Sequence, residues 1–88
     1  MGQKYKVPAN IAWRQVDDEV VVLDLNTSVY YSFNEVGAAI WEQLAKSLPP
    51  EAVAKKVAED FGEDAKTVSA DVKDFIKGLT KEKLLQPA

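Results

Sequence analysis

The chain has 88 residues and a formal net charge of −3, from 11 basic and 14 acidic residues, and it contains neither Cys nor His. A chain of this length predicts a single domain, 1–88, and the missing residue types exclude disulfides, thiol nucleophiles, zinc sites and His-dependent catalysis. The acidic balance argues against nucleic acid as a partner, and the scattered glycines offer no phosphate loop for a cofactor. No apolar run is long enough for a signal peptide or membrane span. Because a small extracellular domain usually needs disulfides, the absence of Cys makes us expect a cytoplasmic protein.

The first third of the chain is rich in strand-forming residues. Residues 1–10 lack periodicity and contain a proline, and we expect a loose arm there. After it, short runs of β-branched and aromatic residues alternate with clusters of turn-forming residues, which is typical of a hairpin-linked sheet. We predict three antiparallel strands, at 11–16, 19–25 and 29–33.

Side chains alternate between the two faces of a strand, and this period assigns the faces of the predicted sheet. The face that carries Asp24 is expected to be the wetter one, because Asp is seldom fully buried. The side chains predicted to face the helices are then Val21, Leu23, Leu25, Val29, Tyr31 and Phe33. The opposite face is predicted to carry Val20, Val22, Asp24, Tyr30 and Ser32.

The rest of the chain predicts three helices with apolar residues at four-residue spacing. Asn34 is suited to cap the first helix, Pro49–Pro50 separates it from the second, Gly62 is placed to end the second, and the third begins near 64–65. The stripes are Val36, Ile40, Trp41 and Leu44, then Val53, Val57 and Phe61, then Val68, Val72, Ile76 and Leu79 with Phe75 beside them. Together these elements predict a winged-helix-like α+β fold, in which an N-terminal three-stranded antiparallel sheet packs on three helices.

The order of these motifs resembles the PqqD family, which includes the pyrroloquinoline quinone biosynthesis protein D and the peptide-recognition domains of ribosomal peptide maturation. The runs that carry the likeness are 22–25, 29–34, 37–41 and 71–79, and it extends over about residues 11–86. The sequence departs from the family pattern with Phe33 in place of Leu, with Lys83 in place of Gly, and with no Gly in the turn at 26–28. These departures leave the subfamily and the peptide open.

The resemblance implies a bacterial peptide chaperone that is not an enzyme. Such a protein holds the leader of a ribosomally made precursor peptide and presents it to a modifying enzyme, often of the radical S-adenosylmethionine class. The peptide is expected to lie along the third strand, in a groove shared with the third helix. A strand at the edge of a sheet has unpaired backbone groups to which a peptide can add as a further strand. The predicted peptide-binding residues are Val29, Tyr30, Tyr31, Ser32, Phe33, Val68, Asp71, Val72, Phe75 and Ile76.

Several of these residues have a plain structural alternative. Phe33 and the stripe residues Val68, Val72, Ile76 and Leu79 can simply form the core, and then Tyr30 and Ser32 are the favoured contacts. Asp71 is a helix-surface acid by default. Trp41 favours packing, Trp13 suits either role, and Lys73 and Lys77 can meet leader acids.

Three other functions stay open at this point. One is a winged-helix DNA-binding or transcription-associated protein, which would need a basic third helix. Another is a dimerisation module that pairs with itself through the same strand edge and forms a homodimer. The last is a small enzyme with a pair of catalytic carboxylates.

Overall fold

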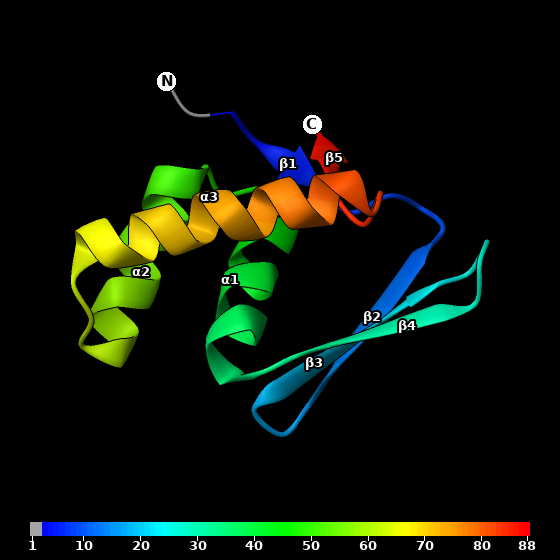
Figure 1. The fold of residues 1–88 in the computed structure, drawn as a ribbon, viewed down its shortest axis with the longest axis horizontal. Coiled ribbons are helices and arrows are strands. Elements are labelled where there is room, and N and C mark those ends of the chain that lie inside the picture. The colour runs from blue at the N-terminus through cyan, green and yellow to red at the C-terminus, as the bar shows by residue number, and fades with distance from the viewer. Residues whose placement is uncertain (1–2) are drawn as a thin grey trace.

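The computed structural model describes residues 3–88, and it confirms the α+β fold. The elements are β1 (Tyr5–Lys6), β2 (Ile11–Val16), β3 (Glu19–Asp24), β4 (Val29–Phe33), α1 (Glu35–Ala45), α2 (Pro50–Phe61), α3 (Ala65–Lys81) and β5 (Gln86–Pro87). Figure 1 shows the three helices on one side of the molecule and the β2–β3–β4 sheet on the other, with β4 leading directly into α1. No helix in the described part of the chain is long and apolar enough to cross a membrane.

The main sheet is antiparallel with the strand order β2–β3–β4. β3 is the central strand, and its register pairs Val20 with Phe33 and Val22 with Tyr31. β4 is therefore an edge strand, as predicted: within residues 3–88 no strand pairs with its outer side. An edge strand keeps a row of backbone N–H and C=O groups without ladder partners, so β4 offers main-chain hydrogen bonds to another chain.

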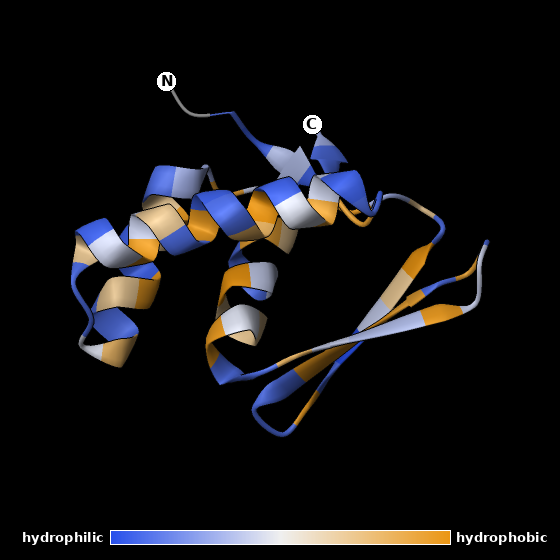
Figure 2. Ribbon diagram, in the orientation of Figure 1, coloured by the Kyte–Doolittle hydropathy of each residue, from blue (hydrophilic) through white to orange (hydrophobic). Residues whose placement is uncertain are grey.

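The face of β3 that meets the helices is the opposite of the predicted one. Val20 and Val22 are 0% exposed and Asp24 is 6% exposed, whereas Leu25 is 57% exposed. The predicted face of β4 is correct for Tyr31 and Phe33, which are partly buried against the core. Figure 2 shows that apolar residues occur along the strands of this sheet, so composition alone does not tell the two faces apart.

The buried Asp24 carboxylate explains this error. Its Oδ1 accepts hydrogen bonds from the backbone N–H of Asn26 at 2.9 Å, from that of Thr27 at 3.3 Å, and from Asn10 Nδ2 at 3.3 Å. Burial by itself would raise the pKa of Asp24, but these hydrogen bonds outweigh burial and hold the pKa below its ordinary value. An acid in a strand can therefore face the core when a turn supplies its donors.

The N-terminal segment also differs from the predicted loose arm at 1–10. Tyr5 and Lys6 pair antiparallel with Pro87 and Gln86, and the N–H of Ala88 donates to the carbonyl of Lys4 at 2.9 Å. Tyr5 also packs against the core. Residues 1 and 2 lie outside the described part of the chain. Two-residue strands have no periodicity to detect, so this pairing of the chain ends leaves no sequence signal.

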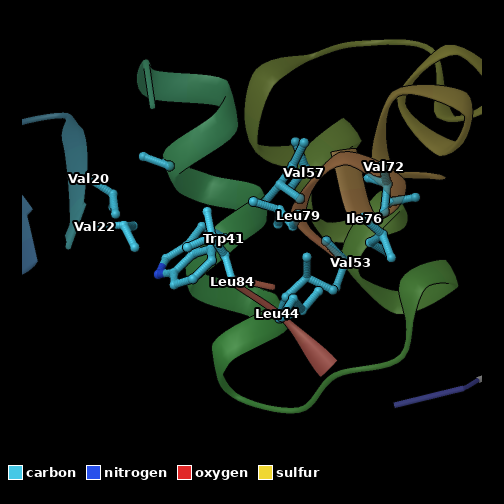
Figure 3. Close-up of a cluster of buried hydrophobic side chains, with 14 of the residues drawn as sticks. Val20, Val22, Trp41, Leu44, Val53, Val57, Val72, Ile76, Leu79 and Leu84 are labelled. Atoms are coloured by element: carbon cyan, nitrogen blue, oxygen red, sulfur yellow. The ribbon is translucent and has the colours of Figure 1, made fainter. Parts of the chain in front are cut away.

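The core lies where the three helices meet the inner face of the sheet. Its fully buried side chains include Trp41, which stands between Val20 and Val22 of β3 and Leu44 and Leu84 (Figure 3). Trp13 on β2 is 38% exposed and packs edge-on against Trp41, with ring centroids 6.0 Å apart. The α3 stripe of Val68, Val72, Ile76 and Leu79 is buried as predicted.

The predicted α1 stripe is wrong at its first member. Val36 is 39% exposed, whereas Ala38, Ile40 and Leu44 are buried with Trp41. A step of four residues turns about 40° around a helix. Val36 lies two such steps from Leu44 and has therefore rotated off the buried side.

Candidate functional site

An apolar groove of about 320 Å³ lies between β4 and the C-terminal half of α3. We call it the β4–α3 groove. Its lining residues are Tyr31, Phe33, Asp74, Phe75, Gly78, Leu79, Lys81, Glu82 and Leu84. The groove runs beside the free edge of β4, so a chain that pairs with this edge would also lie next to the groove.

Aromatic rings that pack against the core form one wall of the groove. Phe33 meets Phe75 edge-on with ring centroids 5.0 Å apart, and it meets the fully buried Trp41 at 5.7 Å. Gly37 in the first turn of α1 permits this arrangement, since a Cβ there would lie 3.2 Å from the Phe33 Cβ and 3.7 Å from the Phe75 ring. Because Trp41 is held by the core, the wall is preformed, and a ligand would not have to order it.

The C-terminal end of α3 forms the floor of the groove. The N–H of Lys83 donates to the carbonyl of Thr80 at 3.1 Å and that of Leu84 donates to the carbonyl of Leu79 at 2.9 Å, which is the Schellman pattern of helix ends. Lys83 stands at the left-handed position of this motif, with φ of 62°. The turn places Leu84 against Leu79, and both side chains are buried at the base of the groove.

The polar rim of the groove holds both signs of charge. Asp74, Lys81 and Glu82 line it, whereas Lys73 and Lys77 are exposed on α3 and are not among the lining residues. Burial and the nearby Glu82 carboxylate raise the pKa of the Tyr31 hydroxyl. A tyrosine hydroxyl is neutral at pH 7 even at its ordinary pKa of 10.0, and the upward shift keeps it a hydrogen-bond donor into the alkaline range.

The two faces of β4 present different surfaces. Tyr31 and Phe33 point to the groove, whereas Tyr30, which is 69% exposed, and Ser32 belong to the opposite face. Around Tyr30 lies a second hollow of about 280 Å³, lined by Ala12, Trp13, Arg14, Val21, Leu23 and Tyr30. An added strand would direct alternate side chains to these two surfaces.

The structure brings together only part of the predicted set. Tyr31, Phe33 and Phe75 line the groove, and Val29, Tyr30 and Ser32 lie on the free edge strand beside it. Asp71 is exposed on α3 outside the groove lining. Val68, Val72 and Ile76 are at most 7% exposed and belong to the core, which is the structural alternative that the sequence left open.

Sequence reasoning missed the ridge of α3 that borders the groove. Asp74, Gly78 and Glu82 are spaced four residues apart, so they lie along one side of the helix next to Phe75 and Leu79. This spacing was available in the sequence. What was missing is the position of β4, which turns this side of the helix into a wall of the groove.

A third and larger hollow of about 510 Å³ lies beside the β3–β4 turn, and Asp24 lines it with Asn26 and Thr27. The Asp24 carboxylate already accepts hydrogen bonds within the turn, so its burial has a structural reason and does not indicate a ligand site. Within residues 3–88 no cluster of three or more His, Cys, Asp or Glu side chains is placed to hold a metal ion. The β4–α3 groove combines an apolar lining with a free strand edge and with a wall of aromatic rings that contact the core.

Two solved structures are similar to this chain over most of its length. The structure described as "TbiB1 in Complex with the TbiA(beta) Leader Peptide" matches with a TM-score of 0.85 and 32% identity, over 92% of this chain and 94% of that chain. A second, "Lasso peptide synthetase B1 complexed with the leader peptide", has the same fold, with a TM-score of 0.85 and 20% identity over 96% and 99% of the two chains.

A comparison with curated proteins gives no match. The family model for "Coenzyme PQQ synthesis protein D (PqqD)" matches residues 19–85, which covers β3, β4, the three helices and the whole β4–α3 groove. The resemblance drawn from the sequence motifs is therefore confirmed, and this chain belongs to the PqqD family.

Proposed function

We propose that this protein is a non-catalytic recognition protein that captures the leader segment of a ribosomally made precursor peptide by strand addition to β4. The observation that carries the proposal is the free edge of β4 beside an apolar groove. It is supported by 32% identity to TbiB1, whose structure contains the TbiA(beta) leader peptide.

The two parts of the site divide the work of recognition. Main-chain hydrogen bonds to residues 29–33 supply affinity that depends little on the peptide sequence, and side-chain hollows beside the strand supply selectivity. Alternate peptide residues would enter the groove over Tyr31, Phe33 and Phe75, and the intervening residues would lie near Tyr30 and Ser32. A short strand with two or three anchors is compatible with micromolar affinity, which corresponds to about −8 kcal/mol.

A modifying enzyme is the second partner that the proposal requires. Holding the leader along β4 leaves the rest of the precursor free, so that an enzyme can act on it while the leader remains bound. Membership in the PqqD family supports this role, and the radical S-adenosylmethionine class is the first class to test. The protein would act where precursors are made, in the bacterial cytoplasm.

The DNA-binding alternative finds little support in the structure. α3 exposes Asp71 and Asp74 among its lysines, and the chain carries a net charge of −3, whereas phosphate binding requires a basic surface. Pairing of two copies through β4 uses the same edge as the peptide. A homodimer would therefore compete with peptide binding. If the protein dimerises through β4, added peptide should dissociate the dimer.

A nitrogen–proton NMR titration of the labelled protein tests the proposal. The ligands are the TbiA(beta) leader peptide and peptides selected on this protein from a displayed random library, with a short DNA duplex as the control. Saturable shifts are expected at residues 29–33 and along the groove side of α3, with none from DNA. The proposal is wrong if none of these peptides binds, or if the shifts lie away from β4 and α3.

A further inference from the structure

Gly78 is a glycine inside α3 that the fold itself does not require. Glycine is among the poorest helix-forming residues, because it gives up the most backbone freedom on folding. The other two glycines of the described chain have clear structural reasons. Gly62 ends α2 with a left-handed φ of 65°. At Gly37, an added Cβ would lie only 3.2 Å from the Cβ of Phe33. Gly78 has an ordinary helical conformation, so it is not required by a left-handed backbone. It is not required by a close neighbour either.

The end of α3 makes the position of this glycine more telling. The Schellman turn that closes the helix needs a left-handed residue, which is the usual place for glycine. In this chain that place is taken by Lys83, with φ of 62°. α3 thus contains a glycine on its groove side and none at the position where its backbone would benefit from one.

The space around Gly78 is open. A Cβ built at this position would meet no atom of another element within 4 Å. Gly78 stands between Asp74 and Glu82 on the ridge that borders the groove, and Phe75 and Leu79 lie beside it. The missing side chain therefore leaves a gap in the wall of an otherwise apolar groove, opposite Tyr31 and Phe33.

We infer that the gap at Gly78 receives a large apolar or aromatic side chain of the bound peptide and so sets the residue size that the protein accepts at that peptide position. Burial of apolar area and ring contacts with Phe33 and Phe75 favour such a residue. A small residue there would leave the gap to water and those rings partly exposed. The inference rests on the proposed function, because it assumes a peptide on β4.

The inference is tested by selecting peptides on a variant in which a large side chain fills the space at Gly78. Wild-type protein and the Gly78→Leu variant are each used to select peptides from the same displayed random library. Wild type is expected to enrich peptides with a large apolar residue at one fixed position, and Gly78→Leu to enrich Gly, Ala or Ser there. Each selected peptide should bind its own protein at least about tenfold tighter than the other protein, a factor worth about 1.4 kcal/mol.

Two controls separate a lost gap from general damage. Ala70→Leu adds a large side chain at an exposed position of α3 outside the groove, and it should select the same peptides as wild type. Because the chain has no Cys, Gly78→Cys provides a single thiol that can be modified after folding. Peptide affinity should fall stepwise as the group attached to this thiol grows, and bound peptide should slow the attachment.

The outcomes distinguish this inference from the proposed function. If wild type enriches no peptide, the proposed function fails and the inference fails with it. If wild type binds peptides but Gly78→Leu selects the same residue sizes and the modified Cys binds as tightly as wild type, the role of Gly78 is refuted while peptide binding stands.

Discussion

Replacing Lys83 by glycine should stabilise the protein. Lys83 occupies the left-handed position that ends α3, with φ of 62°, and its N–H donates to the Thr80 carbonyl at 3.1 Å. In this region the Cβ of an L-residue crowds the following carbonyl oxygen. Glycine adopts the same backbone conformation without that contact, so Lys83→Gly keeps the hydrogen bonds of the turn and removes the strain.

The size of the effect follows from two opposing terms. The left-handed conformation costs an L-residue about 1–2 kcal/mol, and the greater freedom of glycine in the unfolded chain offsets about 0.5–1 kcal/mol of the gain. Taking the middle of each range, the net increase in the free energy of unfolding should be about 0.75 kcal/mol. For a domain of 60–100 residues 1 kcal/mol corresponds to about 4–8 °C in Tm, so the expected rise is about 3–6 °C.

Thermal and urea unfolding followed by circular dichroism measure this change. The matched control is Lys77→Gly, the same substitution at an exposed helical position of α3, which should lower the unfolding free energy by about 0.5–1 kcal/mol. The two variants should thus move in opposite directions. Equal or lower stability of Lys83→Gly relative to wild type would refute the account of how α3 ends.

Three further changes test other parts of the structure. Gly78→Ala should raise the unfolding free energy by about 0.5–1 kcal/mol, because a methyl group meets open space; a loss in urea unfolding would contradict the open gap. Asp24→Ala should lower the unfolding free energy by about 1.5–3 kcal/mol, because the backbone N–H groups of Asn26 and Thr27 lose a charged acceptor. An unchanged value would show that the carboxylate does not hold the turn. The pKa of Asp24 is lowered in the fold from an ordinary value of 3.8. The ionised carboxylate therefore stabilises the protein above pH 3.8, and this stabilisation disappears as the pH falls through the lowered pKa. Wild type should show this loss of stability in acid, and Asp24→Ala should not. Gly37→Ala should weaken peptide binding several-fold by displacing Phe33, and equal affinity in a fluorescence titration would argue against a preformed wall.

The sequence predicts most of the elements of this fold, because their signals are local. The β-branched runs and turn clusters locate β2, β3 and β4 to within one residue, and Asn34 and Gly62 mark helix ends that the structure confirms. The pairing of β1 with β5 is not predictable in this way. It joins the two ends of the chain through two-residue strands, and neither strand is long enough to show a period.

The orientation of β3 shows where local reasoning fails. Asp24 is an acid in a strand, and by composition it belongs to solvent, yet its carboxylate accepts hydrogen bonds from its own turn and from Asn10. Whether those donors are available depends on how the β2–β3–β4 sheet closes. Assigning Asp24 to the solvent face is what led to the wrong prediction that Val21 and Leu23 face the helices.

The candidate site was predictable in its strand and less so in its helix. Tyr31, Phe33 and Phe75 were identified from the strand pattern and the family resemblance, and they line the groove. The position of Gly78 beside the groove could not be predicted, because the sequence does not show which element faces that side of α3. Tertiary contacts between β4 and α3 create that setting.

The most direct test of strand addition is a set of intermolecular NMR contacts between the labelled protein and a bound leader peptide. Strand addition to β4 predicts Hα–Hα and amide contacts in a regular ladder between the peptide backbone and residues 29–33, with alternate peptide side chains contacting Phe75 and Leu79. A peptide that binds through side chains alone, with no backbone ladder on β4, or that pairs with the edge of β2, would contradict the account.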